Sequence, residues 1–227
     1  MRFVQKNTVI PADFLNSFTG INAFSNLYND NKQAILSVLI NEQKGLCVYC
    51  NQKITVGTAT IEHLICQSHN HSFDLNYYNL LAVCKGNQGV PNAMHCDKYR
   101  SHQQNDYFLP FFFFEKCITT QLDKMNPFFD VEYNRRADLI SGKIIAKEQR
   151  IDGFPGIRHR IEHVIDNVLN LNAPILKDAR KAKWESVLIT KAEFGYDWYA
   201  LFDYFITLTE PTNFHEFVLL AIRKQIP

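Results

Sequence analysis

Three apolar residues share one face of a helix that the pattern predicts from about residue 30 to residue 44: Ile35, Val38 and Leu39. Either Asp30 or Asn31 is placed to cap this helix, and Gly45 stands where a left-handed residue commonly ends one. Residues 1–30 show no such period. We interpret them as an N-terminal arm whose phenylalanines pack on the domain.

Beyond residue 156, apolar positions recur every three or four residues, and Pro174 and Pro211 separate the groups. This pattern predicts four helices, built on these sets: Ile157, Ile161, Val164, Ile165 and Val168; Leu176, Ala179, Trp184, Val187 and Leu188; Trp198, Leu201, Phe202 and Phe205; Phe214, Phe217, Val218 and Ala221. The last helix begins at residues 211–213, with Glu216 as its capping-box partner.

The middle of the chain has shorter runs of apolar residues, broken by glycine, proline and asparagine. They predict four elements: a hairpin of residues 53–55 and 58–61, a short helix over 77–83, a helix over 97–103, and a hairpin of residues 131–133 and 143–146 around Ser141-Gly142. We interpret the four phenylalanines at 111–114 as a buried strand or a partner contact rather than a surface for stacking bases. The predicted class is α+β, in four parts: an arm at 1–30, a core at 31–107, a strand and hairpin segment packed on the core at 108–156, and a helical region at 157–227.

The composition narrows the class of protein. Of the 227 residues, 46% are hydrophobic and 21% are charged, which is typical of a globular chain with a sizeable core. The net charge of +1 excludes polyanion binding through overall charge, so any contact with nucleic acid depends on local patches. We find no signal peptide and no membrane span. We therefore expect a cytoplasmic protein whose six cysteines are metal ligands or free thiols rather than disulfides.

Four cysteines form two pairs, which is the ligand set of a structural zinc site: Cys47, Cys50, Cys84 and Cys96. Two residues separate the members of the first pair, as is usual, but eleven separate the members of the second. His95, or less favourably Cys66, is an alternative ligand, and Cys66 and Cys84 can also be small buried apolar residues. We predict a closed Zn²⁺ site of four cysteines.

An acidic residue and a histidine, Glu62 and His63, lie between the two cysteine pairs. A histidine whose pKa is near neutrality can take a proton from water, and a carboxylate beside it can hold a hard divalent cation. The same dipeptide recurs as Glu162-His163 in the helical region, where no cysteine is near, and we interpret that pair as an exposed helix face. The setting alone distinguishes the two pairs.

Together with Asn79 and Asp97, the stretch from about residue 40 to residue 105 resembles the HNH endonucleases, or ββα-metal nucleases. Their pattern is a cysteine pair, an acid–histidine pair followed by proline, Asn-Leu, and a final Cys-x-x-Cys-Asn-x-x-Lys. The matching positions are Cys47, Cys50, Glu62, His63, Asn79, Leu80, Cys84 and Cys96. Cys66 stands in place of the proline. Asp97 stands in place of the last metal ligand and keeps an oxygen there.

The resemblance implies a role for each residue. His63 is expected to be the general base, and Glu62 and Asp97 to hold one Mg²⁺ or similar divalent ion. Asn79 is expected to fix the loop that carries His63 through backbone hydrogen bonds, although it can also be an ordinary helix cap. The implied fold is a ββα-metal core with zinc-binding cysteine knuckles, followed by a mainly α-helical C-terminal region.

A closer resemblance is to the PtuB-like nuclease subunits of Septu-type and retron-associated antiphage defence systems. It rests on residues 61–63, on the long insert before His95-Cys96-Asp97, and on residues 168–172 followed by Leu176 and Arg180. It implies a nucleic acid substrate and a PtuA-like ATPase of the ABC and SMC type as partner. In the retron context it also implies a reverse transcriptase with its RNA–DNA. The helical region is the expected partner interface, through these aromatic residues: Trp184, Trp198, Tyr199 and Tyr204.

Basic residues near the predicted site are few. Lys98 and Arg100 follow the last metal ligand and are candidates to touch phosphate. Lys177, Arg180 and Lys181 share a helix face that is either phosphate-binding or simply solvated. Three functions stay open: a nuclease that cuts DNA, which we favour; a ribonuclease acting on RNA such as tRNA; and a non-catalytic zinc-stabilised module that binds nucleic acid or the ATPase.

Overall fold

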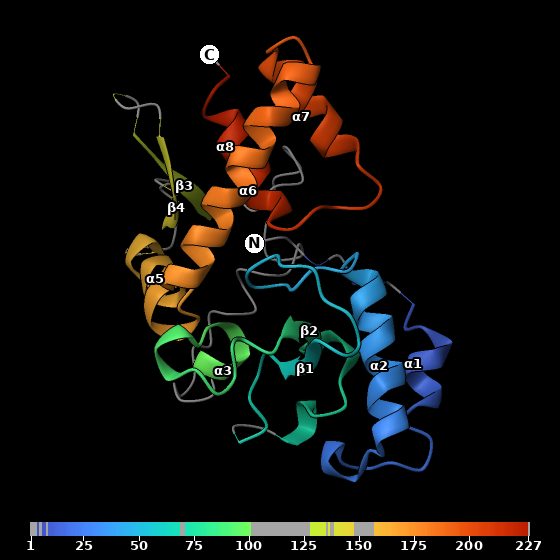
Figure 1. The fold of residues 1–227 in the computed structure, drawn as a ribbon. Helices are drawn as coiled ribbons and strands as arrows, with labels where there is room; N and C mark the ends of the chain where they lie inside the picture. The colour runs from blue at the N-terminus through green and yellow to red at the C-terminus, as the bar shows by residue number, and fades with distance from the viewer. Residues whose placement is uncertain are drawn as a thin grey trace.

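The computed structural model describes residues 4, 6–7, 9–68, 71–100, 128–134, 136, 139–147 and 157–226. The elements of its N-terminal half are α1 (Ala12–Asn16), α2 (Asn29–Glu42), β1 (Ala59–His63), β2 (Leu80–Cys84) and α3 (Cys96–Arg100). Those of its C-terminal half are β3 (Phe129–Asn134), β4 (Leu139–Ala146), α5 (Ile157–His163), α6 (Pro174–Glu193), α7 (Trp198–Thr207) and α8 (His215–Arg223). Figure 1 shows the two halves, with α5 beside their junction. The predicted mixture of helices and small sheets is confirmed for the described residues.

Helix α2 is the helix predicted near residue 30, and it packs on β2, with Ile35 and Leu39 among its buried residues. No side chain caps its start; Asn31 instead donates a hydrogen bond from Nδ2 to the carbonyl of Ser17 (2.9 Å). The predicted end is confirmed. Gly45 is left-handed at a φ of +72°, and its N–H donates to the carbonyl of Ile40 (2.9 Å).

The first sheet differs from the predicted hairpin. Strand β1 pairs antiparallel with β2, from Ala59 opposite Cys84 to His63 opposite Leu80, so residues 53–55 are not its partner. The predicted helix over 77–83 is also wrong, because only Tyr77–Asn79 form a helical turn, of the 3-10 type. All five residues of β2 are buried. A short, continuous apolar run fits a buried strand and a buried helix equally well, which explains the error.

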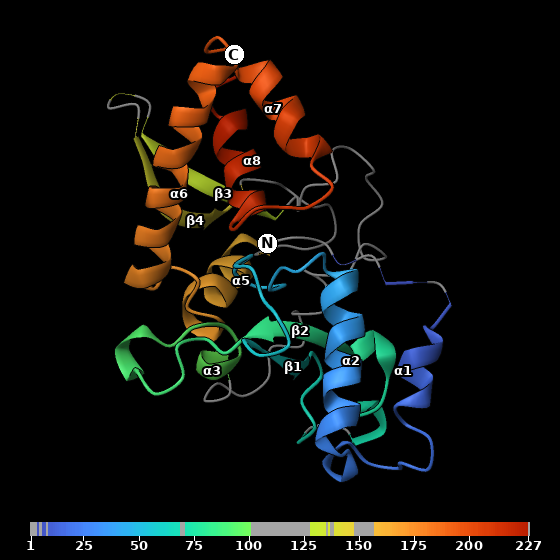
Figure 2. The ribbon, with the colours of Figure 1, turned by 45° about the vertical axis from the view of Figure 1, so that its right-hand side comes forward.

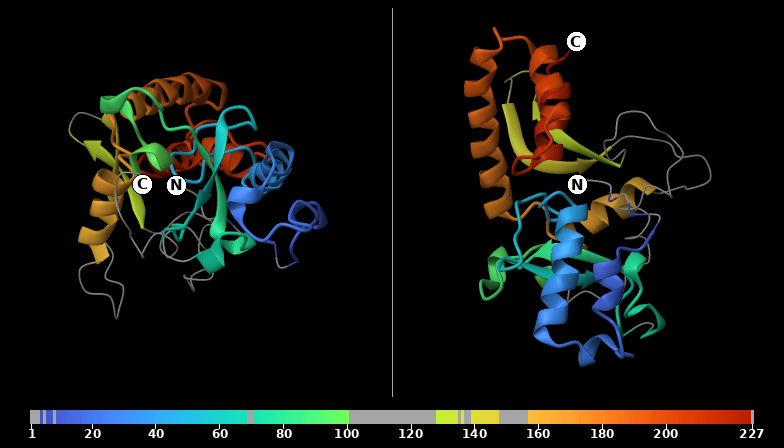
Figure 3. Two further views of the ribbon diagram at one scale, coloured as in Figure 1. Left: turned by 90° about the horizontal axis from the view of Figure 1, so that it is seen from below. Right: turned by 90° about the vertical axis from the view of Figure 1, so that its right-hand side faces the viewer.

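The second hairpin is confirmed, but its pairing closes at Asn134 opposite Leu139, and Gly142 lies inside β4. A Cβ at position 142 would lie 2.3 Å from the carbonyl oxygen of Lys177, so glycine there lets β4 approach α6 closely. The hairpin packs on α6 and α8 (Figure 3, right). The remainder of the segment expected to pack on the core, at 108–127 and 148–156, lies outside the described residues.

The four predicted C-terminal helices are present. The first comprises α5 and a π-helical turn over Val164–Val168, and α6, α7 and α8 lie together in Figure 2. The predicted capping box of α8 is wrong. Phe214, left-handed at a φ of +55°, precedes the helix, and no side chain caps it. Asn213 instead accepts a hydrogen bond on Oδ1 from the N–H of Lys53 (2.6 Å), which ties the two halves together.

The predicted packing of the N-terminal arm is confirmed at Phe14, which is 1% exposed and meets the ring of Tyr77 edge-on. The phenylalanine run at 111–114 lies outside the described residues, as do the last residues of the helix predicted over 97–103. Among the described residues, no helix has the length and apolar character needed to cross a membrane.

Candidate functional site

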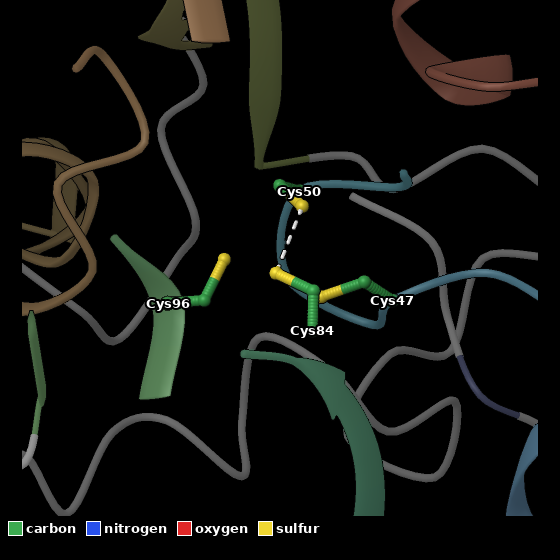
Figure 4. A group of neighbouring side chains, drawn as sticks. All are labelled: Cys47, Cys50, Cys84 and Cys96. Atoms are coloured by element: carbon green, nitrogen blue, oxygen red, sulfur yellow. Dashed lines mark hydrogen bonds between the residues drawn. The ribbon is translucent and has the colours of Figure 1, made fainter. Parts of the chain in front are cut away.

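The four paired cysteines converge at one buried point, and their sulfur atoms all lie within 4.8 Å of one another. Cys47 and Cys50 come from the tight turn after α2, where the N–H of Asn51 donates to the carbonyl of Cys47 (2.9 Å). Cys84 ends β2 and Cys96 begins α3. Figure 4 shows the side chains turned toward a common centre.

The long insert of the second pair does not keep its cysteines apart. The N–H of His95 donates to the carbonyl of Gly86 (3.1 Å), which closes the insert at its base and brings Cys96 back to Cys84. Gly86 is left-handed at a φ of +55°, and a Cβ there would lie 2.0 Å from the carbonyl oxygen of His95. Glycine is therefore required for this close approach.

The donor set fits a structural zinc ion. Zinc bound to four thiolates at about 2.3 Å needs sulfur atoms roughly 3.8 Å apart. The sulfur atoms of Cys50 and Cys84 are separated by 3.7 Å. Neither proposed alternative ligand belongs to the cluster: Cys66 lies outside it, and His95 approaches Cys96 Sγ with Nδ1 (3.2 Å) without joining the four. The cluster is therefore compatible with a closed metal site of four cysteines.

The thiols of the cluster influence one another's protonation. Burial raises the pKa of Cys47, but the thiols of Cys50, Cys84 and Cys96 donate hydrogen bonds to it and hold its pKa well below the usual range. The pKa of Cys84 is raised, chiefly by its hydrogen bond to Cys47, and burial raises that of Cys96. A divalent cation would favour deprotonation of the whole set.

A second cluster forms around Glu62 on β1. Its Oε1 accepts a hydrogen bond from the hydroxyl of Tyr49 (2.9 Å). In the sequence, Tyr49 stands between the two cysteines of the first pair. Nη1 of Arg100 also binds this oxygen, and donates to the carbonyl of His63 (2.8 Å). Burial raises the pKa of Glu62 to about 7, with Asp97 adding to the rise and Arg100 opposing it. Asp97 thus lies within electrostatic range of Glu62, and the two carboxyl groups are neighbours.

His63 ends β1 beside this pair of carboxyl groups. Its Nε2 lies 3.0 Å from the carbonyl oxygen of Asp74, and because a carbonyl can only accept, Nε2 carries the proton. The basic nitrogen is then Nδ1. Burial lowers the pKa of His63, so the ring is neutral near pH 7. The ring of Phe24 from the N-terminal arm packs edge-on against it at 4.6 Å between centroids.

Asn79 makes the backbone hydrogen bonds expected of a loop-fixing residue rather than those of a helix cap. Its Oδ1 accepts from the N–H of Ile65 (2.7 Å), and its Nδ2 donates to the carbonyls of Ile65 and Phe73 (3.1 Å each). Asn76 is the residue that caps the adjacent turn, by accepting from the N–H of Tyr78. Asn79 therefore joins both ends of the loop between His63 and Asp74.

Two expectations about basic residues need correction. Arg100 is 5% exposed and bound to Glu62 and to backbone carbonyls, so it holds the end of β1 and is not available to a phosphate. Arg180 is 0% exposed, so it is not part of the proposed basic face. Lys181, which was placed on the same face, is exposed. Lys98 is partly exposed and lies 3.5 Å from Asp97. Elsewhere, Glu162 pairs with Arg158 on an exposed face of α5.

The sequence reasoning missed Tyr49, Asp74 and the placement of Arg180. Tyr49 and Asp74 act through a hydroxyl and a backbone carbonyl, for which the sequence carries no signal. The burial of Arg180 could have been predicted, because it lies four residues from both Leu176 and Trp184, on the apolar face of α6.

No protein-family model matches the chain, and no match was found among curated proteins.

Proposed function

We propose that this chain is a metal-dependent endonuclease of the HNH type. The observation that supports it best is the grouping at the end of β1: a neutral histidine with a fixed tautomer stands beside two carboxyl groups, next to a cluster of four cysteines. General-base hydrolysis needs such an imidazole. A module that only binds has no need of the acid–histidine pair.

In this proposal His63 acts as the general base. Nδ1 takes a proton from water while the water oxygen forms a bond to phosphorus and the bond from phosphorus to the leaving 3′ oxygen breaks. The carbonyl of Asp74 holds the proton on Nε2, which keeps Nδ1 basic and stabilises the imidazolium that forms. Asn79 keeps Asp74 in place by joining both ends of its loop.

Glu62 and Asp97 are the residues proposed to hold a divalent ion such as Mg²⁺. Two neighbouring carboxyl groups fit that role, because burial and, to a smaller extent, the charge of Asp97 raise the pKa of Glu62, and a bound cation would favour its ionised form. When bound, the ion supplies charge stabilisation for the phosphate oxygens and the leaving oxygen. Tyr49 and Arg100 orient Glu62 through Oε1.

The proposed substrate is DNA, and the proposed setting is an antiphage defence complex with a PtuA-like ATPase, in the Septu or retron context. RNA such as tRNA is the alternative substrate of the same site. Cleavage by the purified chain, alone and with the co-expressed ATPase, on plasmid, single-stranded DNA and total tRNA separates the two.

His63→Ala tests the mechanism. Loss of a general base typically lowers the rate by roughly 10²–10⁴-fold, whereas fold and metal content stay as they are. Glu62→Ala and Asp97→Ala should each recover some activity at higher Mg²⁺ or Mn²⁺. His163→Ala, in the exposed look-alike pair, is the matched control and should have no effect. Full cleavage by His63→Ala would overturn the proposal and favour the non-catalytic zinc-stabilised module.

The partner surface is proposed on α6 and α7. Trp184 is 7% exposed and stacks on Trp198, so it belongs to the core. Ile189 and Tyr199 are 73% and 58% exposed and are better candidates for the interface. Ile189→Glu combined with Tyr199→Glu should abolish co-purification with the ATPase, whereas Leu139→Glu, at an exposed apolar residue of β4, should not. Undiminished co-purification of the double variant would reject this surface.

A further inference from the structure

Arg180 of α6 is a buried cation without an acidic partner among the described residues. It is 0% exposed. Nη1 donates to the carbonyl of Gly142 (3.1 Å), while Nε and Nη2 have no hydrogen-bond partner in the described part of the chain. One face of the guanidinium lies over the ring of Phe214, 5.7 Å from its centroid. A buried charge is strongly unfavourable unless an opposite charge compensates it.

The surroundings of Arg180 connect it to the cysteine cluster. The N–H of Phe214, the residue beneath the guanidinium, donates to the carbonyl of Asn51, directly after Cys50 (2.8 Å). The other knuckle is tied to the same half, because the N–H of Cys96 donates to the carbonyl of Leu169 (2.8 Å). The C-terminal half thus forms backbone hydrogen bonds beside both cysteine pairs. The buried cation Arg180 belongs to the same half.

The charges agree with this placement. Burial lowers the pKa of Arg180 to about 10, and the cysteines that oppose this shift are Cys50 and Cys96, one from each pair. The guanidinium is therefore within electrostatic reach of a cysteine from each pair.

We propose that Arg180 is the charge partner of a metal ion held by the four cysteines, and that it makes this metal centre a joint between the two halves of the chain. A Zn²⁺ ion with four thiolates carries a net charge of about −2, which a buried guanidinium partly offsets. The negative charge of the thiolates likewise compensates the positive charge of the buried Arg180 guanidinium. The proposal rests on a metal at the cysteine cluster and is independent of nuclease activity.

The experiment compares the full-length zinc-loaded chain with Arg180→Met, which removes the charge, and Arg180→Lys, which keeps it. Lys181→Met, one residue further on α6 and exposed, is the matched control. Zinc release into excess chelator is followed at a temperature at which circular dichroism shows every variant to be folded. Changes around a metal's ligands typically lower affinity roughly 10- to 100-fold. We therefore expect Arg180→Met to hold zinc at least about tenfold more weakly, Arg180→Lys to restore part of the loss, and Lys181→Met to match the wild type.

A merely structural role gives a different result. In that case Arg180→Met lowers the melting temperature but releases zinc at the wild-type rate, and the proposal is rejected. If Arg180→Met does not fold, Arg180→Gln is used in its place. If neither folds, hydrogen exchange in the wild type decides: stripping the zinc must speed exchange at the amides of Cys96 and Phe214, which join the halves. Unchanged protection there overturns the proposal.

Discussion

Replacing Asn79 with alanine tests the loop that positions His63, whatever the chain's activity. The side chain of Asn79 is buried, with 4% of the residue exposed, and it makes three hydrogen bonds to the backbone of Ile65 and Phe73. Alanine removes all three and leaves half-buried backbone groups of Ile65 and Phe73 without these partners. Such groups cannot all turn to water without opening the loop.

A net contribution of about 1 kcal/mol for each hydrogen bond gives a loss of about 3 kcal/mol in the free energy of unfolding. For a chain of this length, that loss lowers the melting temperature by roughly 6–12 °C. The amide of Ile65 should lose protection first, since it donates to Asn79 Oδ1. Cleavage, if present, should fall with it, because Asp74 no longer holds the His63 ring.

Urea unfolding and hydrogen exchange resolved at Ile65 are the measurements. Asn76→Ala is the matched control, because it removes one capping bond three residues away and should cost about 1 kcal/mol with Ile65 still protected. If Asn79→Ala costs no more than this control, or if Ile65 stays protected, the loop is held by other contacts and the reasoning fails.

Three further predictions follow from the two clusters. The chain should retain about one zinc per molecule after dialysis, and Cys47→Ser should lower both zinc content and melting temperature; a fully stable zinc-free chain would refute the metal site. The Gly86→Ala variant should retain less zinc than the wild type. The Gly89→Ala variant should retain as much, because Gly89 is also left-handed, at a φ of +91°, but has open space where a Cβ would lie. Equal retention by both variants would contradict the need for a close approach at Gly86. Glu62 has a pKa of about 7, and as a proposed ligand it would bind a cation only when ionised, so cleavage should rise with pH through about 7 and then level off. The rise should move to lower pH at higher Mg²⁺, and a rise that does not depend on Mg²⁺ would point to another group.

The cysteine cluster was predictable because thiols at turn spacing have few other uses in a chain of this kind. The eleven residues between Cys84 and Cys96 argued against a shared site. They do not separate the two cysteines, because a hydrogen bond between His95 and Gly86 closes the base of the insert. The helices were predictable where their apolar face was long, as in α2 and α6. Strand β2 was not, because it is buried on both faces and its sequence has no period of two.

The basic residues were the least predictable part of the site. Lys177, Arg180 and Lys181 have the spacing of one helix face, yet Arg180 is buried and Lys181 is exposed. Arg100 likewise turns inward, to Glu62. Arg100 pairs with an acid 38 residues away in the sequence, and pairs of this kind are set by the tertiary fold rather than by local spacing.

The two clusters share the elements that carry them, so their geometry is coupled. Helix α3 begins at Cys96, and the next residue, Asp97, lies near enough to Glu62 to raise its pKa further. The turn of the first pair carries Tyr49, which binds the same carboxylate. A metal at the cysteines would therefore fix the start of α3 and the position of Tyr49 at once, and with them both carboxyl groups of the proposed active site. Removing zinc should then abolish cleavage even though His63 stays on β1, and Mg²⁺ alone should not restore it. Cleavage that survives complete loss of zinc would show that α3 is held by other contacts.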